Sequence, residues 1–240
     1  MLVQKIAEGL WRWALPHPAW KPEFDKPGGG GWAEMVGCVY AEVAGTIVLI
    51  DPLVPGDDAR TKFWEALDRD VARAGGRVLI FIGSVDHGRS ANEIADRYRG
   101  EVIGDAAIRE SVSCRLDATF DDRKLPRGVI ALPVVGMSPG ERAFYLEPWN
   151  TAIFADAVIG TGNGRVRVAP ASWGIKTEAG RATYENGFRA SLRAVADLRP
   201  EIVLPSHGDP VLTAGAASLD GALSGPAWGE DGPPPSVPRE

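Results

Sequence analysis

The sequence has few of the features that mark disulfide-rich, nucleic-acid-binding or membrane-spanning proteins. Its two cysteines, Cys38 and Cys114, lie far apart and outside any C-x-x-C spacing, so neither a disulfide framework nor a thiolate zinc site is expected. The net charge is -6, and no block of basic residues occurs, which argues against nucleic acid as a partner. No apolar run approaches the roughly 18 residues that span a bilayer, and the first residues lack a secretory leader pattern. We therefore expect a cytoplasmic protein without a membrane partner.

The composition is that of a folded protein with a sizeable core. Hydrophobic residues make up 45% of the 240 positions, which is enough for one large domain. We predict a single domain over residues 1–225. Residues 226–240, PAWGEDGPPPSVPRE, are rich in proline, glycine and acids, and we predict a disordered tail there.

Strand patterns and helix patterns occur in both halves of the chain. The predicted strands cover residues 3–15, 35–43, 46–51, 77–83, 101–105, 128–136, 141–148, 151–160 and 201–210. A first helix is predicted from Asp57 as its N-cap, and a second one from a capping box of Ser90 and Glu93. A third is predicted over residues 184–198. The pattern indicates an α/β protein.

Polar residues with metal-binding chemistry follow several of the predicted strands. Asp86 and His87 come after the strand at 77–83, Asp156 interrupts the apolar run TAIFADAVIG, and His207 stands in LPSHGDP. Catalytic groups of α/β proteins lie beyond the carboxyl ends of strands. Two imidazoles and two carboxylates can hold zinc or another first-row divalent metal and leave room for water. We predict a metal site made of these four residues, which would also be the catalytic residues.

The order and spacing of these residues resemble the metallo-β-lactamase superfamily. Its H-x-H-x-D-H motif aligns with IGSVDH at 82–87, where Asp86 and His87 match and two histidines are replaced, by Ile82 and Ser84. Its G-H-T-P-G segment aligns with GMSPG at 136–140, where Met137 takes the place of the histidine. The metal-bridging aspartate and the last motif histidine match Asp156 and His207.

This resemblance covers about residues 3–223 and implies a four-layer αβ/βα sandwich with a metal site along one edge. It also implies a degenerate site, because the ligands of the first metal are replaced and those of the second are retained. At most one metal is then expected. Two hypotheses remain open. The protein is a mononuclear hydrolase of an ester, thioester or phosphoester, or it is a non-catalytic pseudoenzyme that binds a small ligand in the same cleft.

A segment rich in tryptophan, proline and glycine separates the first strands. Trp20 and Trp32 are predicted to form an apolar lid over a small-molecule substrate. Trp11 and Trp13 alternate along a strand, so we expect them to pack in the core. For His17 we favour a surface position in the loop over a role as an additional metal ligand.

Two charged residues near the Asp-His pair have predicted supporting roles. Arg89 either neutralises the site or binds an anionic group of the substrate through its planar fork. Asp51 ends the strand TIVLID and is expected to organise the neighbouring loop by hydrogen bonds.

Overall fold

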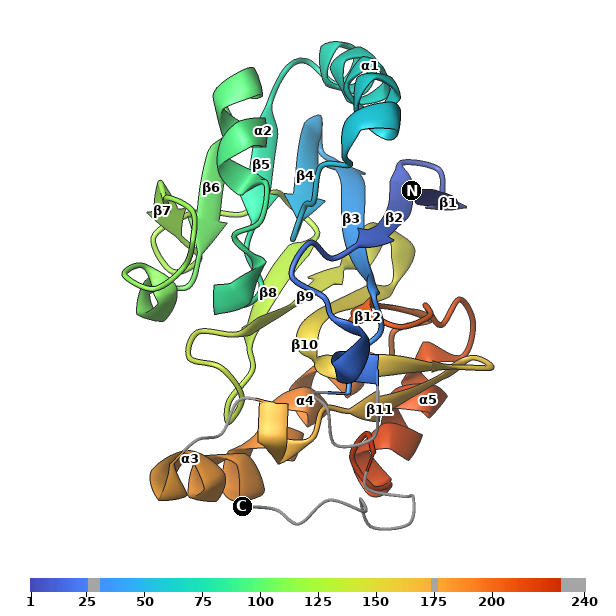
Figure 1. Cartoon of the computed structure of the whole chain (residues 1–240), viewed down its shortest axis with the longest axis vertical. Helices are drawn as coiled ribbons and strands as arrows, with labels where there is room; N and C mark the ends of the chain where they lie inside the picture. Colours follow the sequence, from blue (N-terminus) through green and yellow to red (C-terminus); the bar gives the residue numbers. More distant parts are fainter. Residues whose placement is uncertain (26–30, 174–176, 230–240) are drawn as a thin grey trace.

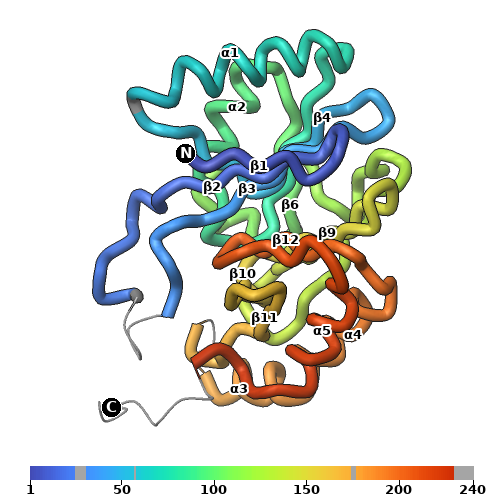
Figure 2. Tube along the Cα trace, turned by 90° about the vertical axis from the view of Figure 1, so that its right-hand side faces the viewer, coloured from blue at the N-terminus to red at the C-terminus, as the bar shows by residue number. Residues whose placement is uncertain are grey.

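The structure is a computed structural model, and it describes residues 1–25, 31–173 and 177–229. Strands form its centre, with helices α1 and α2 on one outer side and α3, α4 and α5 on the other (Figures 1 and 2). The α/β architecture with helices on both outer sides, predicted from the sequence, is confirmed. No helix in the described part of the chain combines the length and apolar character needed to cross a bilayer.

Strands and helices occur in both halves of the chain, as the sequence patterns predict. The strands are β1 (Leu2–Ala7), β2 (Leu10–Pro16), β3 (Met35–Val43), β4 (Thr46–Ile50), β5 (Val78–Phe81), β6 (Glu101–Gly104), β7 (Ala118–Thr119), β8 (Val129–Pro133), β9 (Arg142–Leu146), β10 (Thr151–Gly162), β11 (Arg165–Val168) and β12 (Ile202–His207). The α-helices are α1 (Asp57–Arg73), α2 (Ala91–Tyr98), α3 (Glu178–Thr183), α4 (Arg189–Ala196) and α5 (Gly215–Ser224). Short helical turns include η1 (Pro22–Asp25), η2 (Val85–His87) and η6 (Tyr184–Phe188).

One curled sheet connects the two halves of the chain, the first of which carries α1 and α2 and the second α3, α4 and α5. Its strand order is β7-β6-β5-β4-β3-β12-β10-β9-β8, with β2 also paired to β3, β1 to β2 and β11 to β10. The halves meet where β12 pairs antiparallel with β3, and the register there places His207 opposite Val36. The last residue of β12 therefore lies at the junction of the two halves.

Continuous apolar strands bury both of their faces, because successive side chains point to opposite sides of a sheet. In β4, Ile47 and Leu49 join the core beneath α1 and α2, whereas Val48 and Ile50 join an inner core. The inner core also contains Phe81 from β5 and Phe144 from β9, whose rings stack with centroids 5.6 Å apart. A third core lies beneath α4 and α5. The inner core holds the two halves together.

Five local predictions need correction. Residues 3–15 form a hairpin and not one strand, since Gly9 adopts a φ of 74° between β1 and β2, a conformation that glycine permits. Helix α1 begins at Asp57, and Gly56 is its N-cap. Ser90 does not cap α2 with its side chain, because its Oγ accepts a hydrogen bond from Val54 N instead.

The fourth correction concerns the helix predicted at 184–198. It consists of the π-helical turn η6 followed by α4, which ends at Ala196. Of the predicted tail, Ala227 is buried and Trp228 N donates to Val168 O, so this part of the segment packs on the fold. Residues 230–240 of that predicted tail lie outside the described residues.

Candidate metal centre

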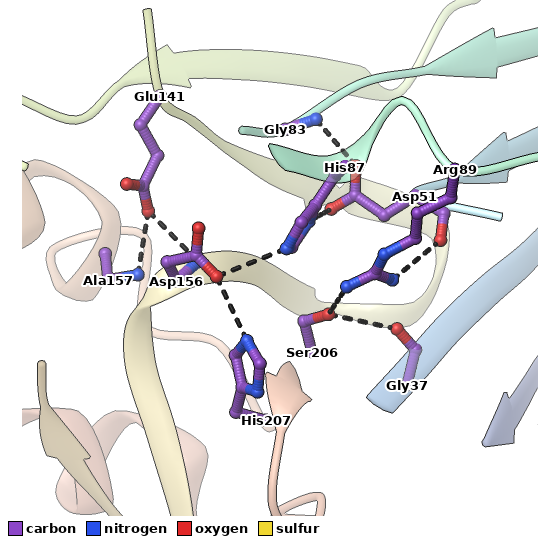
Figure 3. Close-up of polar contacts among 10 residues, drawn as sticks. All are labelled: Gly37, Asp51, Gly83, His87, Arg89, Glu141, Asp156, Ala157, Ser206 and His207. Carbon is purple, nitrogen blue, oxygen red and sulfur yellow. Dashed lines mark hydrogen bonds and ion pairs between the residues drawn. The ribbon is translucent and has the colours of Figure 1, made fainter. Parts of the chain in front are cut away.

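Three side chains from distant parts of the sequence meet at the junction of the two halves (Figure 3). They are His87 from η2, Asp156 from β10 and His207 from the end of β12. Asp156 Oδ1 lies 3.2 Å from His87 Nε2 and 3.1 Å from His207 Nε2. One donor atom from each residue falls within 4.8 Å of the other two. The structure therefore brings together three of the four predicted ligands.

The fourth predicted ligand, Asp86, is not part of this group. It shares the turn η2 with His87, but its side chain is exposed whereas that of His87 is buried. Neighbouring residues of a tight turn point in different directions, so adjacency in the sequence does not bring both side chains to one point. Asp86 lines the cleft beside the group.

His87 is held from behind by Asp51. Asp51 Oδ2 lies 2.8 Å from His87 Nδ1, and Asp51 Oδ1 accepts a hydrogen bond from Gly83 N at 2.7 Å. Asp51 follows β4 with a φ of 50°, a left-handed conformation that is uncommon for a residue with a side chain. Since a carboxylate accepts hydrogen bonds, His87 Nδ1 carries a proton and donates it, which directs Nε2 toward Asp156.

The loop that carries His207 is fixed by close backbone contacts. Arg12, buried in β2, donates from Nη2 to Gly208 O at 2.9 Å and to Pro205 O at 3.4 Å. A side chain on Gly160 would collide with the backbone of Asp209. Glycine at this position therefore lets β10 approach the His207 loop closely, which places Asp156 and His207 side by side.

Protonation of the group follows from burial and from the mutual charges. Burial and the Arg89 charge lower the pKa of His87, but the carboxylates of Asp156 and Asp51 outweigh them and raise it to about 9. Burial raises the pKa of Asp156, but the charge of His87 and hydrogen bonds from both histidines bring it well below its usual value. Burial lowers the pKa of His207. Without a metal, His87 is thus an imidazolium beside the Asp156 carboxylate, and neutral His207 donates Nε2–H.

Glu141 lies beside Asp156, and its carboxylate points toward Asp156 and Ala157 (Figure 3). It is 1% exposed, and its Oε1 accepts hydrogen bonds from Asp156 N at 3.2 Å and Ala157 N at 2.7 Å. Its Oε2 is buried and has no hydrogen-bond partner in the described part of the chain. Burial and the nearby Asp156 charge raise the pKa of Glu141 to about 8. These effects favour the protonated form of Glu141, which fixes the backbone that carries Asp156.

The donor set fits one divalent metal. Two imidazole nitrogens and a carboxylate oxygen are donors that zinc and other first-row dications accept, and three protein ligands leave a position for water. The contact from Asp51 to His87 has the form of the outer hydrogen bonds that orient metal-bound histidines. This group is the one cluster of three or more potential ligands among the described residues.

The three residues predicted to stand in place of the first-metal histidines offer no strong metal donors. Ile82 is fully buried in the core beneath α1 and α2, and Ser84 is also fully buried. Met137 is buried too and lines the cleft with its thioether side chain. Nothing at these three positions offers an imidazole or a carboxylate.

A cleft of about 410 Å³ opens beside the group. Trp32 lines it, as predicted for a lid residue, and its ring meets that of His207 edge-on at 5.3 Å. Trp20 does not line the cleft but supports Trp32, since its Nε1 donates to Trp32 O at 3.1 Å. His17 lines the cleft as well and contacts the Trp32 ring edge-on at 5.2 Å. His17 is half-buried in its loop, and it is not one of the three convergent donors.

Arg89 also lines the cleft, and it bridges the two halves (Figure 3). Its Nη1 donates to Asp51 O at 3.1 Å and its Nη2 to Ser206 Oγ at 3.3 Å. Trp11 and Trp13 pack against the core beneath α1 and α2, as predicted from their alternation in β2.

Sequence reasoning missed Glu141 and Trp173. Glu141 had a detectable signal, because an acid directly before the apolar strand RAFYL must find a partner when it is buried. Trp173 lies in a turn without periodicity, so nothing local indicated that its ring would meet His207 edge-on at 5.3 Å. Asp51 was expected to form hydrogen bonds, but its partner His87 was not identified.

Solved structures of metallo-β-lactamases are similar to this chain over most of its length. A metallo-beta-lactamase from Hirschia baltica is 13% identical, covers 93% of this chain and 96% of its own, and has a TM-score of 0.64. One from Pontibacter korlensis is 14% identical, with 93% and 97% covered and a TM-score of 0.62. A metallo-beta-lactamase family protein from Thermus thermophilus is 16% identical, with 92% and 80% covered and a TM-score of 0.56. No protein-family model and no curated protein matches the sequence.

At these identities the likeness concerns the fold. The chain has the metallo-β-lactamase fold, which confirms the architecture implied by the sequence motifs. A fold of this kind does not by itself specify the reaction, so function is argued from the site.

Proposed function

We propose that this protein is a metal-dependent hydrolase that holds a single divalent metal, zinc or another first-row ion, and acts on an ester, thioester or phosphoester. The observation that carries the proposal is the convergence of His87 Nε2, Asp156 Oδ1 and His207 Nε2 within 4.8 Å at the edge of a cleft. All three are donors for such an ion.

The described residues have separable roles in this proposal. His87, Asp156 and His207 would hold the metal, and Asp51 keeps the His87 ring in the orientation that presents Nε2. Glu141 fixes the backbone of Asp156 through two hydrogen bonds. When bound, such a metal supplies Lewis-acid chemistry, since it polarises a carbonyl or phosphoryl oxygen and makes water acidic enough to attack near neutral pH. The aromatic side chains of the cleft exclude bulk water and position the substrate.

A second candidate function is binding of a small ligand without catalysis. Its support is that Asp156 Oδ1 is already joined to both imidazoles, so the imidazolium of His87 and the carboxylate of Asp156 pair with each other without a metal. In this case the cleft would bind the ligand and the cluster would be structural.

Metal content distinguishes the two candidates. The protein is purified without chelator, dialysed against zinc, and analysed for metal per chain, and it is then assayed with panels of aryl esters, thioesters and phosphoesters. We expect about one metal per chain, loss of that metal in Asp156→Ala, and turnover that a chelator abolishes and zinc restores. Absence of bound metal after dialysis against zinc would reject the hydrolase and leave the binding protein.

A further inference from the structure

Arg89 holds a positive charge in the cleft without an acidic partner. Its two hydrogen bonds go to neutral oxygens, the carbonyl of Asp51 and the hydroxyl of Ser206. Its Nε is buried and has no partner among the described residues. The guanidinium is held in place by these contacts, but no described carboxylate forms an ion pair with it.

The carboxylates of Asp51 and Asp156 are bound to other groups. The Asp51 carboxylate binds His87 and Gly83 N, and Asp156 binds His87 and His207. Asp86 also lines the cleft, but its side chain is exposed and water screens its charge. Arg89 therefore makes no hydrogen bond to a described carboxylate, and its guanidinium keeps N–H groups from which an incoming anion can accept hydrogen bonds.

Two indoles form an apolar wall in the same cleft. Trp32 and Trp173 both line the cleft and both meet the His207 ring edge-on, with centroids 5.3 Å away. The Trp32 ring stacks on Phe24 at 5.3 Å. Both indoles are half-buried, so each keeps part of its surface open for a ligand. The aromatic surface is therefore in place beside the metal-binding group.

We infer that the substrate carries an anionic carboxylate or phosphate group that binds Arg89, joined to a flat apolar part that lies against Trp32 and Trp173. A carboxylate or phosphate matches the fork of a guanidinium, and indole surfaces bind flat apolar groups. That this ligand is a substrate rests on the proposed hydrolase function. Binding of its anionic group and its flat ring does not depend on the metal.

The test measures binding of phenyl phosphate and phenylacetate to chelator-treated protein by calorimetry, with uncharged phenylacetamide as the comparison. We expect the two anions to bind at least about tenfold more tightly than the amide, because only they neutralise Arg89. Arg89→Met should reduce anion binding to the level of the amide, and Arg89→Lys should reduce it partly, since lysine keeps the charge and loses the fork. Trp173→Ala should weaken phenyl phosphate several-fold and leave inorganic phosphate unchanged.

A matched control is Arg193→Met. Arg193 is an exposed arginine of α4 that pairs with Asp220 and does not line the cleft, so this variant should leave all affinities unchanged. Ser206→Ala gives a second, milder variant should Arg89→Met not fold, because it removes the hydroxyl that positions Nη2. It should weaken both anions several-fold. Equal affinity of the anions and the amide, or full anion affinity in Arg89→Met, would overturn the inference.

Zinc content of the same preparations separates this inference from the proposed function. If the protein holds one zinc per chain but binds anions independently of Arg89, the result supports the proposed hydrolase function and contradicts the role of Arg89. If the protein binds anions through Arg89 but holds no zinc, the result supports the anion-binding site and contradicts the proposed hydrolase function.

Discussion

Asp51 Oδ2 lies 2.8 Å from His87 Nδ1, and the same carboxylate accepts a hydrogen bond from Gly83 N. The Asp51 side chain thus connects the end of β4 with the segment after β5. It also orients the ring of His87, which faces Asp156. The backbone of Asp51 has a φ of 50°, and its carboxylate faces the His87 ring. A hydrogen bond of this kind fixes the tautomer and the ring orientation of a metal-binding histidine, although its acceptor does not contact the metal.

Replacing Asp51 should weaken metal binding without removing a ligand. In Asp51→Asn the amide cannot accept hydrogen bonds with both atoms, so His87 loses part of its orientation. We expect zinc affinity to fall by about tenfold to a hundredfold, measured by competition with a chelating dye. Asp117→Asn is the control, because Asp117 accepts a hydrogen bond from Val102 N away from the site. Equal zinc affinity of wild type and Asp51→Asn would exclude the orienting role.

Asp86 and Asp156 should differ sharply in their effect on metal content. Asp156→Ala and His207→Ala each remove one of three convergent donors, so we expect both variants to lose the metal on dialysis. Asp86→Ala removes an exposed carboxylate outside that group and should keep about one zinc per chain. Elemental analysis of the three variants measures this directly. Loss of zinc from Asp86→Ala would show that Asp86 is a ligand, as the motif alone predicts.

Glu141 should make the metal-free protein less stable as the pH rises. Its pKa is raised from an ordinary value of 4.5 to about 8, so between these values the folded protein binds a proton that the unfolded chain does not. This contribution to stability is fully present below pH 4.5 and is lost as the pH rises through about 8. Glu141→Gln mimics the protonated acid, and its free energy of unfolding should decline less between about pH 5 and 8. Urea denaturation across this range is the measurement, and parallel curves for both proteins would contradict it.

Gly160 should be required for the close approach of β10 to the His207 loop. A side chain there collides with the backbone of Asp209, so Gly160→Ala should destabilise the fold by about 1–3 kcal/mol. It should also weaken zinc binding, because His207 would move away from Asp156. Gly221→Ala is the matched control, since Gly221 lies in α5 with open space around it, and alanine there should stabilise the helix by about 0.5–1 kcal/mol. Urea denaturation and dye competition test both variants, and unchanged zinc affinity in Gly160→Ala would refute the positional role.

Local sequence patterns predicted most strands because their residues are apolar on both faces. TIVLI became β4 and VLIF became β5, since runs of this kind can only be buried inside a sheet that is covered on both sides. Boundaries were less predictable. Gly9 divided an apolar run into two strands, and Ser90 bonded to Val54 N and not to its own helix, because turn geometry and distant partners decide such details.

The sequence by itself determined the α/β architecture and the chemical identity of His87, Asp156 and His207 as potential donors, because periodicity and residue type are local properties. Only the tertiary structure decided which polar groups meet. It turned Asp86 outward, placed Asp51 against His87 and Glu141 beside Asp156, and left Arg89 without an acidic partner among the described residues. These relations depend on side-chain direction at strand ends and on how two halves of a sheet join at His207 and Val36, and a linear pattern does not contain either.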